Sequence, residues 1–182
     1  MKKVKGNLGY IKYKKTKQSI IVAIFIAAGL SLFFICRTVL GTSRNLGTVV
    51  AVLLTLPAAK ALVNLVLFVP YQSTDAGIAE KLSKEEKETD RRYYDLVFTS
   101  SQSVMHLDYL CVRGTELIAL SENANKNDVI VKYFEESLSK RGINVHMHIF
   151  GKSDEVLVRL HTCNAEAEIP EEITEFIHTI LV

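Results

Sequence analysis

Few residues of this sequence have a type and spacing that could do chemistry. Asp108 lies in the apolar run HLDYLCV, where a carboxylate could bind a divalent metal or move a proton. His146 and His148 alternate in INVHMHIF, which places two imidazoles on one face of a strand, and His106 could complete a metal site with them. No pair of carboxylates accompanies these histidines, so a solvated polar face is the simpler interpretation.

The cysteines do not define a site. Cys36, Cys111 and Cys163 are far apart and show no Cys-x-x-Cys spacing, which indicates buried thiols and neither a disulfide framework nor a zinc site. Cys111 most simply packs in a core, although a Cys/His nucleophile with His106 stays open. The glycines and serines match no phosphate-binding loop or nucleophile elbow. We therefore expect no cofactor, and we favour a non-enzymatic role over an enzymatic one.

The elements that must position these residues begin with two long apolar runs. Ser19 to Cys36 contains no charged residue, and at about 1.5 Å rise per residue it nearly matches a hydrocarbon core of about 30 Å. Gly47 to Tyr71 is long enough to cross with some tilt despite one charge. We predict two membrane helices, about 19–38 and 47–70, within residues 19–71. A cleaved signal peptide is disfavoured because the first run is too long and Arg37 and a second run follow it.

The basic residues near these runs predict an orientation. Seven lysines precede the first run, and they form a basic arm over residues 1–18, whereas the turn from Arg37 to Leu46 carries only Arg37 and Arg44. By the positive-inside rule the N-terminus is cytoplasmic, and two crossings return the C-terminal part to the same side. We therefore predict a multi-pass protein of the cell membrane with both termini cytoplasmic, whose arm contacts anionic lipid headgroups.

Polar residues within the second run are its most unusual feature. Pro57 cannot donate a backbone N–H and is expected to kink the helix. Lys60 lies near mid-membrane, where a charge is costly or needs a partner, and Asn64 shares its helical face. We predict that this face meets a second copy of the chain or a partner membrane protein, and Gly29 in the first run could support such packing. An ion pathway, a lipid phosphate and snorkelling to the interface stay open for Lys60.

Charge separates the chain into two parts. All 20 acidic residues lie at or after Asp75, together with twelve of the 22 Lys and Arg, so this part carries a formal charge of −8. Nucleic acid is not an expected partner, because a phosphate backbone needs a concentrated basic surface. We predict a short linker over 72–77 and a compact cytoplasmic α/β (α+β) domain over 78–182, which is long enough for one core.

Patterns within this domain predict a mixed sheet of about four strands with flanking helices. The expected elements are a charge-dense helix over 78–92, strands over 94–99, 104–112 and 116–121, a helix from 128 to about 141, a strand over 143–150 and a C-terminal helix opened by Pro170. Asn127 is the expected N-cap and Gly142 the expected C′ residue of the middle helix. Residues 154–161 fit a helix or a strand equally well.

The order helix, three strands, helix, strand carries a resemblance. Over residues 78–150 it is similar to the αβββαβ core of the PD-(D/E)XK nuclease-like fold, and HLDYLCVRGTELIALSEN resembles a strand pair of the nuclease-related domain family. In that family an Asp, an acidic residue and a Lys together hold a divalent metal and activate water. Asp108 matches the Asp, whereas the stretch from Ala119 to Glu122 has neither the acid nor the Lys in register. The resemblance therefore implies a catalytically inactive relative.

Three functions remain as hypotheses. The leading one is a membrane-anchored interaction or scaffolding module, whose partners are membrane lipid and either a second copy or another membrane protein. The first alternative is a metal-dependent nuclease-like hydrolase centred on Asp108. The second is a small subunit of a transport assembly that uses Lys60.

Overall fold

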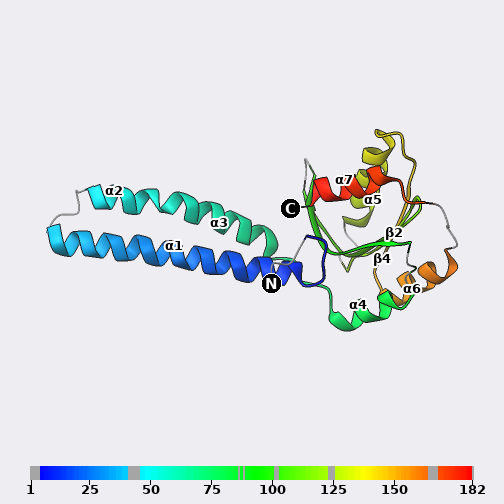
Figure 1. The fold of residues 1–182 in the computed structure, drawn as a ribbon, viewed down its shortest axis with the longest axis horizontal. Coiled ribbons are helices and arrows are strands. Elements are labelled where there is room, and N and C mark those ends of the chain that lie inside the picture. The colour runs from blue at the N-terminus through cyan, green and yellow to red at the C-terminus, as the bar shows by residue number, and fades with distance from the viewer. Residues whose placement is uncertain are drawn as a thin grey trace. The chain divides into compact units, whose positions relative to one another are not determined.

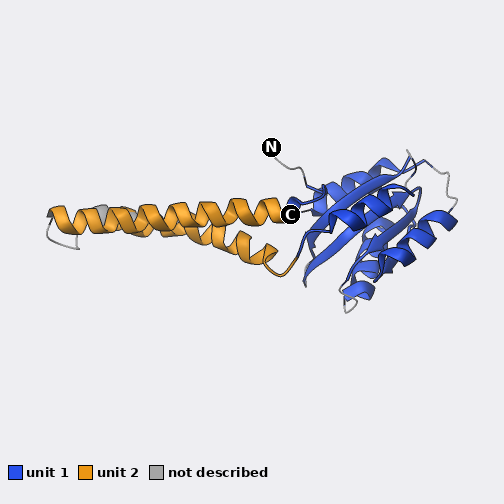
Figure 2. Cartoon of the chain, turned by 90° about the horizontal axis from the view of Figure 1, so that it is seen from below, with its two compact units in different colours: residues 1–10, 72–182 blue, residues 11–71 orange. Residues whose placement is uncertain are grey.

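The computed structural model describes residues 5–40, 46–85, 87, 89–100, 103–122, 126–163 and 168–181 of this 182-residue chain. The chain forms two compact units (Figure 2). One comprises residues 1–10 and 72–182 and is called the lobe; the other comprises residues 11–71 and is called the apolar unit. The apolar unit is therefore an insertion between the first residues of the lobe and the rest of it.

The apolar unit consists of helices. They are α1 (Tyr10–Leu40), which starts at the boundary of the lobe, α2 (Leu46–Leu53) and α3 (Thr55–Phe68) (Figure 1). Within the described residues, α1 is the one helix long and apolar enough to cross a membrane by itself. It begins earlier than the predicted 19–38 because the lysine-rich residues before the apolar run are good helix formers and continue the helix.

A break at Leu54 separates α2 from α3. Leu54 donates to the carbonyl of Val50 at 3.0 Å, and its own carbonyl accepts from Ala58 at 3.4 Å, so helical hydrogen bonds continue across the break. Pro57 has no N–H for the carbonyl of Leu53, and its ring crowds that carbonyl. The distortion expected from Pro57 is therefore present, and it leaves two helices that are each too short to cross a bilayer.

The lobe is built on a four-stranded mixed sheet, as predicted. The strands are β1 (Arg91–Thr99), β2 (Val104–Arg113), β3 (Glu116–Leu120) and β4 (His146–Phe150). They lie in the order β1-β2-β3-β4; the first two pairs are antiparallel, and β3 and β4 are parallel. A parallel pair needs a crossover, and α5 (Asn127–Ser139) provides it.

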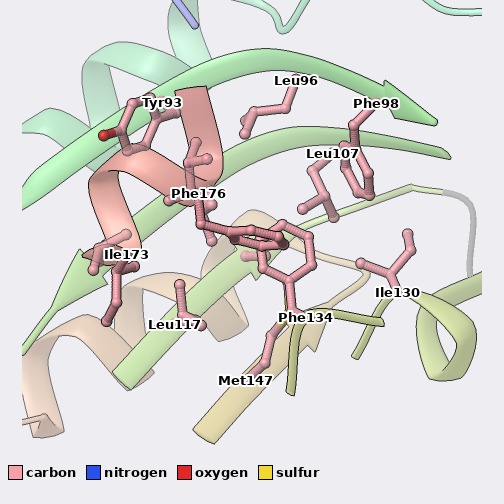
Figure 3. Close-up of a cluster of buried hydrophobic side chains, with 14 of the residues drawn as sticks. Tyr93, Leu96, Phe98, Leu107, Leu117, Ile130, Phe134, Met147, Ile173 and Phe176 are labelled. Carbon is pink, nitrogen blue, oxygen red and sulfur yellow. The ribbon is translucent and has the colours of Figure 1, made fainter. Parts of the chain in front are cut away.

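Helices cover both faces of this sheet (Figure 1). On one face, α5 and α7 (Glu171–Ile180) bury side chains against the sheet, and Phe134 meets Phe176 above Leu117 (Figure 3). On the other face, α4 (Ala76–Ser83) and α6 (Ser153–Thr162) pack their apolar residues against Tyr109 and Ile118. The sheet is therefore the middle layer of three, which buries both of its faces.

The helix predicted over 78–92 is wrong beyond Ser83. Asp75 caps α4 by accepting from the amide of Gly77 at 2.7 Å, and Ala79 and Leu82 are its buried residues. The charged residues that follow offer no further apolar contact, and charge pairs stabilise an isolated helix by only about 0.2–0.5 kcal/mol each. The chain instead enters β1 at Arg91, which pairs with Val112.

The structure assigns one segment that the sequence left ambiguous and tests two predicted helix ends. Residues 154–161 belong to α6, whose Val156 and Leu160 are buried one turn apart. At the end of α5, Ile143 donates to Leu138 and Gly142 donates to Ser139, which is the Schellman pattern with Gly142 at C′ and a φ of 83°. Asn127 is the first helical residue rather than the predicted N-cap.

Residues 5–9, which we call the strap, contact the outer edge of β1 through Gly6. The amide of Tyr94 donates to the carbonyl of Gly6 at 2.7 Å, and Lys5 Nζ donates to the carbonyl of Leu181 at 2.7 Å. Gly6 has a φ of 80°, and a Cβ there would lie 3.0 Å from the ring of Tyr93. Because Leu181 also forms a bridge with Phe98, both ends of the described chain cover this edge.

Arg113 forms the central buried ion pair of the lobe. Its guanidinium binds Asp90 through two hydrogen bonds of 2.9 and 2.6 Å, and both side chains are 1% exposed. It also donates to the carbonyls of Leu160 and Cys163 at the C-terminal end of α6. Burial raises the pKa of Asp90, but hydrogen bonds from Arg113 and from the Lys87 amide outweigh it and leave the pKa lowered. The resulting stability is present above pH 3.9 or so and is lost as the pH falls through the lowered pKa.

We predict that Arg113→Met destabilises the lobe by roughly 3–5 kcal/mol, because Asp90 would remain buried without its partner. Urea unfolding of the solubilised full chain, followed by circular dichroism, measures this loss. Arg159→Met is the matched control: Arg159 is 37% exposed and pairs with Glu116, so its loss should cost less than about 1 kcal/mol. Equal losses in the two variants would contradict the structural role given to Arg113.

Candidate functional site: the Asp95–Asp108 kink

The strand pair that carries Asp108 is distorted at that residue. The pairing of β1 with β2 passes from Tyr94 and Tyr109 to Leu96 and Leu107, so Asp95 lies opposite Asp108 without a regular ladder pair between them. Asp95 has a φ of 52°, the one positive value among described residues other than glycine. Short polar side chains tolerate this region better than most residues do.

This kink reverses the alternation of both strands. In β2, Leu107 and Leu110 both lie in the core on the α5 and α7 face, although a regular strand would place residues three apart on opposite faces. In β1, Tyr93 and Leu96 do the same. The two strands shift together, so their register is kept on either side of the kink.

Thr74 holds the kink from the side of the linker. Asp95, which is 1% exposed, accepts from the amide of Thr74 at 2.8 Å, and the Thr74 hydroxyl lies 3.0 Å from the same oxygen. That hydroxyl donates to the carbonyl of Asp108 at 2.6 Å. The segment predicted as a polar linker is therefore fastened to the lobe immediately after the apolar unit ends.

The Asp108 carboxylate joins β2 to the end of β3. Its Oδ2 accepts from the amide of Glu122 at 3.1 Å, and its Oδ1 lies 3.8 Å from Nδ1 of His106. The side chain is 14% exposed. Burial raises the pKa of Asp108, the charge of Asp95 raises it further, and the Glu122 amide opposes both.

The surroundings of Asp108 suit a structural role better than metal binding. In the described part of the chain, no three His, Cys, Asp or Glu residues converge as a metal-binding group. The nuclease resemblance places an acid and a Lys within the stretch from Ala119 to Glu122, of which Ala119, Leu120 and Ser121 are buried. Glu122 contributes its backbone amide to Asp108, while the residue itself is exposed.

The histidines predicted as weak metal ligands are not brought together with His106. The sheet order places β3 between β2, which carries His106, and β4, which carries the other two. His146 is exposed, whereas His148 Nε2 lies 3.5 Å from a Glu116 oxygen and 3.2 Å from the Arg159 guanidinium. His148 therefore belongs to an ion-pair cluster at the surface.

The remaining candidates are separate from this kink. Cys111 is fully buried in the core on the α4 and α6 face, so no substrate reaches its thiol. On α3, Lys60 and Pro57 are exposed and Asn64 is half-buried, whereas Ala61 and Phe68 are buried. The polar face predicted to meet protein is thus uncovered within the apolar unit.

A hollow of about 300 Å³ lies within the apolar unit, between α1 and the break at Leu54. Phe25, Gly29 and Phe33 of α1 line one side, and Leu54 and Ala58 line the other. Gly29 therefore lines this hollow, and its role in packing against another chain stays a prediction.

Comparison with protein-family models, curated proteins and solved structures gives no match for this chain. Sequence reasoning missed Thr74, Asp95 and the Asp90–Arg113 pair. The weak cue for the pair was an Arg at the end of an otherwise apolar strand, since a buried Arg needs a partner.

We predict that Asp108→Asn raises the stability of the lobe at pH 7, by on the order of 1 kcal/mol. An amide still accepts from Glu122 but carries no charge to bury beside Asp95. Because the pKa of Asp108 is raised in the folded lobe, the neutral form of this carboxyl is the one that stabilises the fold. The lobe therefore loses stability as the pH rises through that raised pKa and Asp108 ionises. Thermal unfolding should show that Asp108→Asn is more stable than the unchanged chain at pH 7 but not at pH 3.5. The control Glu175→Gln, on an exposed face, should match the unchanged chain at both pH values. If Asp108→Asn is less stable than the unchanged chain at pH 7, this interpretation is wrong.

Proposed function

We propose that this chain is a membrane-tethered interaction module. Two crossings of the cell membrane hold the acidic α/β lobe at the cytoplasmic face, and the lobe acts by binding rather than by catalysis. The proposal rests on four features: the exposed apolar surface, the strap, the position of the lysines and the geometry around Asp108.

The apolar surface supports the membrane location. Among described residues, all exposed large apolar side chains lie in the apolar unit except Val129 and Val158. A surface of this kind is costly in water and favourable in hydrocarbon. The helix α1 has the length and composition for one crossing.

The strap is the single observation that carries the proposal of a second crossing. Gly6 accepts a hydrogen bond from Tyr94 of β1, and Lys5 donates one to Leu181, so these residues lie on the same side as the lobe. If α1 crosses the bilayer, the chain must return before Gln72. The returning segment from Leu46 to Phe68 would span about 34 Å at 1.5 Å per residue, enough for a core of about 30 Å.

Lysines support the cytoplasmic orientation. Lys15 Nζ donates to the carbonyl of Val69 at 2.9 Å, and Lys14 Nζ lies 5.7 Å from the centre of the Phe68 ring. The start of α1 and the end of α3 therefore meet, with cations placed at the negative end of the α3 dipole. A lysine-rich end of two membrane helices favours the cytoplasmic side and anionic lipid.

The exposed Lys60 favours a protein partner within the membrane. A lysine at the centre of a membrane helix costs about 2.5–3.5 kcal/mol on insertion scales, and a partner that accepts its hydrogen bonds reduces this cost. A second copy of the chain or another membrane protein could cover this face. A transport assembly would use the same face, and Lys60→Leu would then abolish transport rather than association alone.

The geometry of Asp108 favours binding over catalysis. The order α4, β1, β2, β3, α5, β4 is the one that the nuclease-like resemblance implies, and this keeps a hydrolase as the alternative. However, the stretch from Ala119 to Glu122 has neither the acid nor the Lys in register, and Asp108 is engaged with the Glu122 amide. An inactive relative fits these residues better than an enzyme does.

Cysteine labelling in intact cells tests the topology. In a chain whose Cys36, Cys111 and Cys163 are replaced by Ala, a single cysteine is placed at Ser43, between the two membrane segments, or at Asn144, which is exposed on the lobe. We expect an impermeant maleimide to label Ser43→Cys from outside and to label Asn144→Cys only after permeabilisation.

Each alternative gives a different pattern. A single crossing would expose position 144 together with position 43. The opposite orientation would expose position 144 and protect position 43. A chain that does not cross the membrane would leave both protected until permeabilisation.

A further inference from the structure

The outer edge of β4 is open. His146 donates to the carbonyl of Thr115 at 3.1 Å and the carbonyl of Phe150 accepts from Ser121 at 3.0 Å, so these residues direct their backbone groups toward β3. In a parallel pair the alternate residues point the other way, so Met147 and Ile149 direct theirs outward. In the part of the chain that the structure describes, no strand pairs with this side of β4, whereas the strap and Leu181 cover the opposite edge of the sheet.

A hollow borders this edge on each face of the sheet. On the α6 face, an open hollow of about 450 Å³ lies between β4 and α6 and is lined by His148, Phe150, Glu155, Val158, Arg159 and Thr162. On the α5 face, about 410 Å³ is lined by Asp128, Val131, Lys132, Glu135 and Glu136. Glu135 reaches the β4 edge itself, since its Oε1 accepts from the amide of Met147 at 3.4 Å.

We propose that the β4 edge binds an extended segment of a partner protein, which adds a fifth strand to the sheet. This deepens the proposed function, on which it rests, by naming the surface and the chemistry of the partner. Successive side chains of a strand point to opposite faces, so a docked strand directs alternate side chains into the two hollows. Main-chain hydrogen bonds to Met147 and Ile149 supply affinity, and the hollows supply specificity.

The charges of the residues that line the α5 hollow determine which side chains of a docked strand it favours. Asp128, Glu135 and Glu136 line it against Lys132, whose ammonium lies 3.7 Å from Glu136. The net negative charge favours Lys or Arg side chains. When a strand docks, one of its carbonyl groups accepts the hydrogen bond from the Met147 amide in place of Glu135. The carboxylate of Glu135 is then free to pair with a Lys or Arg of the docked strand.

The α6 hollow offers an apolar contact, at Val158 and Phe150, beside the polar residues His148, Glu155 and Thr162. Val158 is 64% exposed there, and it is one of two exposed large apolar residues in the described lobe. Phe150 is half-buried beside it. The charged residue Arg159 is already held by Glu116 at 3.0 Å. The partner segment therefore alternates basic and apolar residues.

A second copy of this chain fits this edge poorly. Pairing of β4 with another β4 about a two-fold axis would bring each α5 hollow against its copy. Three acidic residues would then face the same three, and like charges at an interface oppose association. The occupant is therefore a different protein.

The test uses full-length protein in phosphatidylcholine nanodiscs and the synthetic peptide acetyl-KVKVKVK-amide, with binding measured by calorimetry. We expect saturable binding that weakens with salt. Two control peptides should bind at least tenfold more weakly: acetyl-EVEVEVE-amide lacks charge complementarity, and acetyl-KKKVVKV-amide lacks the alternation. Binding of acetyl-KVKVKVK-amide to empty nanodiscs should also be at least tenfold weaker, because they lack the protein.

Variants locate the binding. Glu135→Gln keeps an acceptor for Met147 but loses the charge, and should weaken binding about threefold. Ile149→Pro removes an outward N–H without touching the bonds to β3, and should weaken it at least tenfold. Val158→Lys should weaken it about threefold, whereas Val129→Lys, the matched exposed valine, should not.

Two results would overturn the proposal. One is the absence of saturable peptide binding, which would make Glu135 a guard that keeps the edge unpaired. The other is binding that Glu135→Gln and Val158→Lys leave unchanged; these surface variants decide the matter even if Ile149→Pro does not fold. Failure here, with cysteine labelling as expected, would reject the β4 site and leave the membrane-tethered topology standing.

Discussion

The apolar surface of residues 11–71 must be kept out of water, and this constraint organises the whole chain. Helices α1, α2 and α3 expose large aliphatic side chains along their lengths, which is the reverse of what α4 to α7 do. Hydrocarbon removes the cost of that exposure without any protein contact. The lobe then needs its own separate core, and its three layers supply one that does not depend on the apolar unit.

Both chain segments that connect the lobe to the apolar unit are attached to the lobe by hydrogen bonds. The strap pairs with β1 through Gly6 before α1 begins, and Thr74 binds Asp95 soon after α3 ends. The attachment through Gly6 uses backbone groups, whereas the attachment through Thr74 depends on its hydroxyl and on the carboxylate of Asp95. At Gly6 the identity of the residue matters, because φ is positive and a Cβ would crowd the ring of Tyr93. Glycine adopts this conformation at little cost, whereas other residues do not. An insertion anchored at both ends is what the proposed two crossings require, because the chain would have to leave and return beside the same strand.

Local periodicity made much of the fold predictable from the sequence. The alternation of Val145 and Met147 predicted β4, and the spacing of Ile173, Phe176 and Ile177 predicted α7, because one buried face dictates each pattern. The boundary between α4 and β1 was missed because charged residues suit both a helix and an edge strand. The Pro57 distortion was foreseen because its cause lies within one turn of helix.

What the sequence did not reveal depends on contacts between distant residues. The positive φ of Asp95 and the reversed alternation beside it result from Thr74 and Asp108 together, and neither neighbour is adjacent in the chain. The pairing of Arg113 with Asp90 and with the end of α6 joins three segments in the same way. Asp108 was recognised as unusual, but only the Glu122 amide and the buried positions on β3 indicate that it holds the sheet together.

The most direct measurement places the first residues of the chain relative to the last in native membranes. A diazirine-bearing lysine analogue at position 5 of the full chain, activated by light, joins whatever lies beside it, and mass spectrometry identifies the adduct. Because Lys5 Nζ lies 2.7 Å from the carbonyl of Leu181, we predict an intramolecular adduct with the C-terminal residues around position 181. Adducts with lipid or with other chains alone would contradict the return of the chain to the side on which it begins.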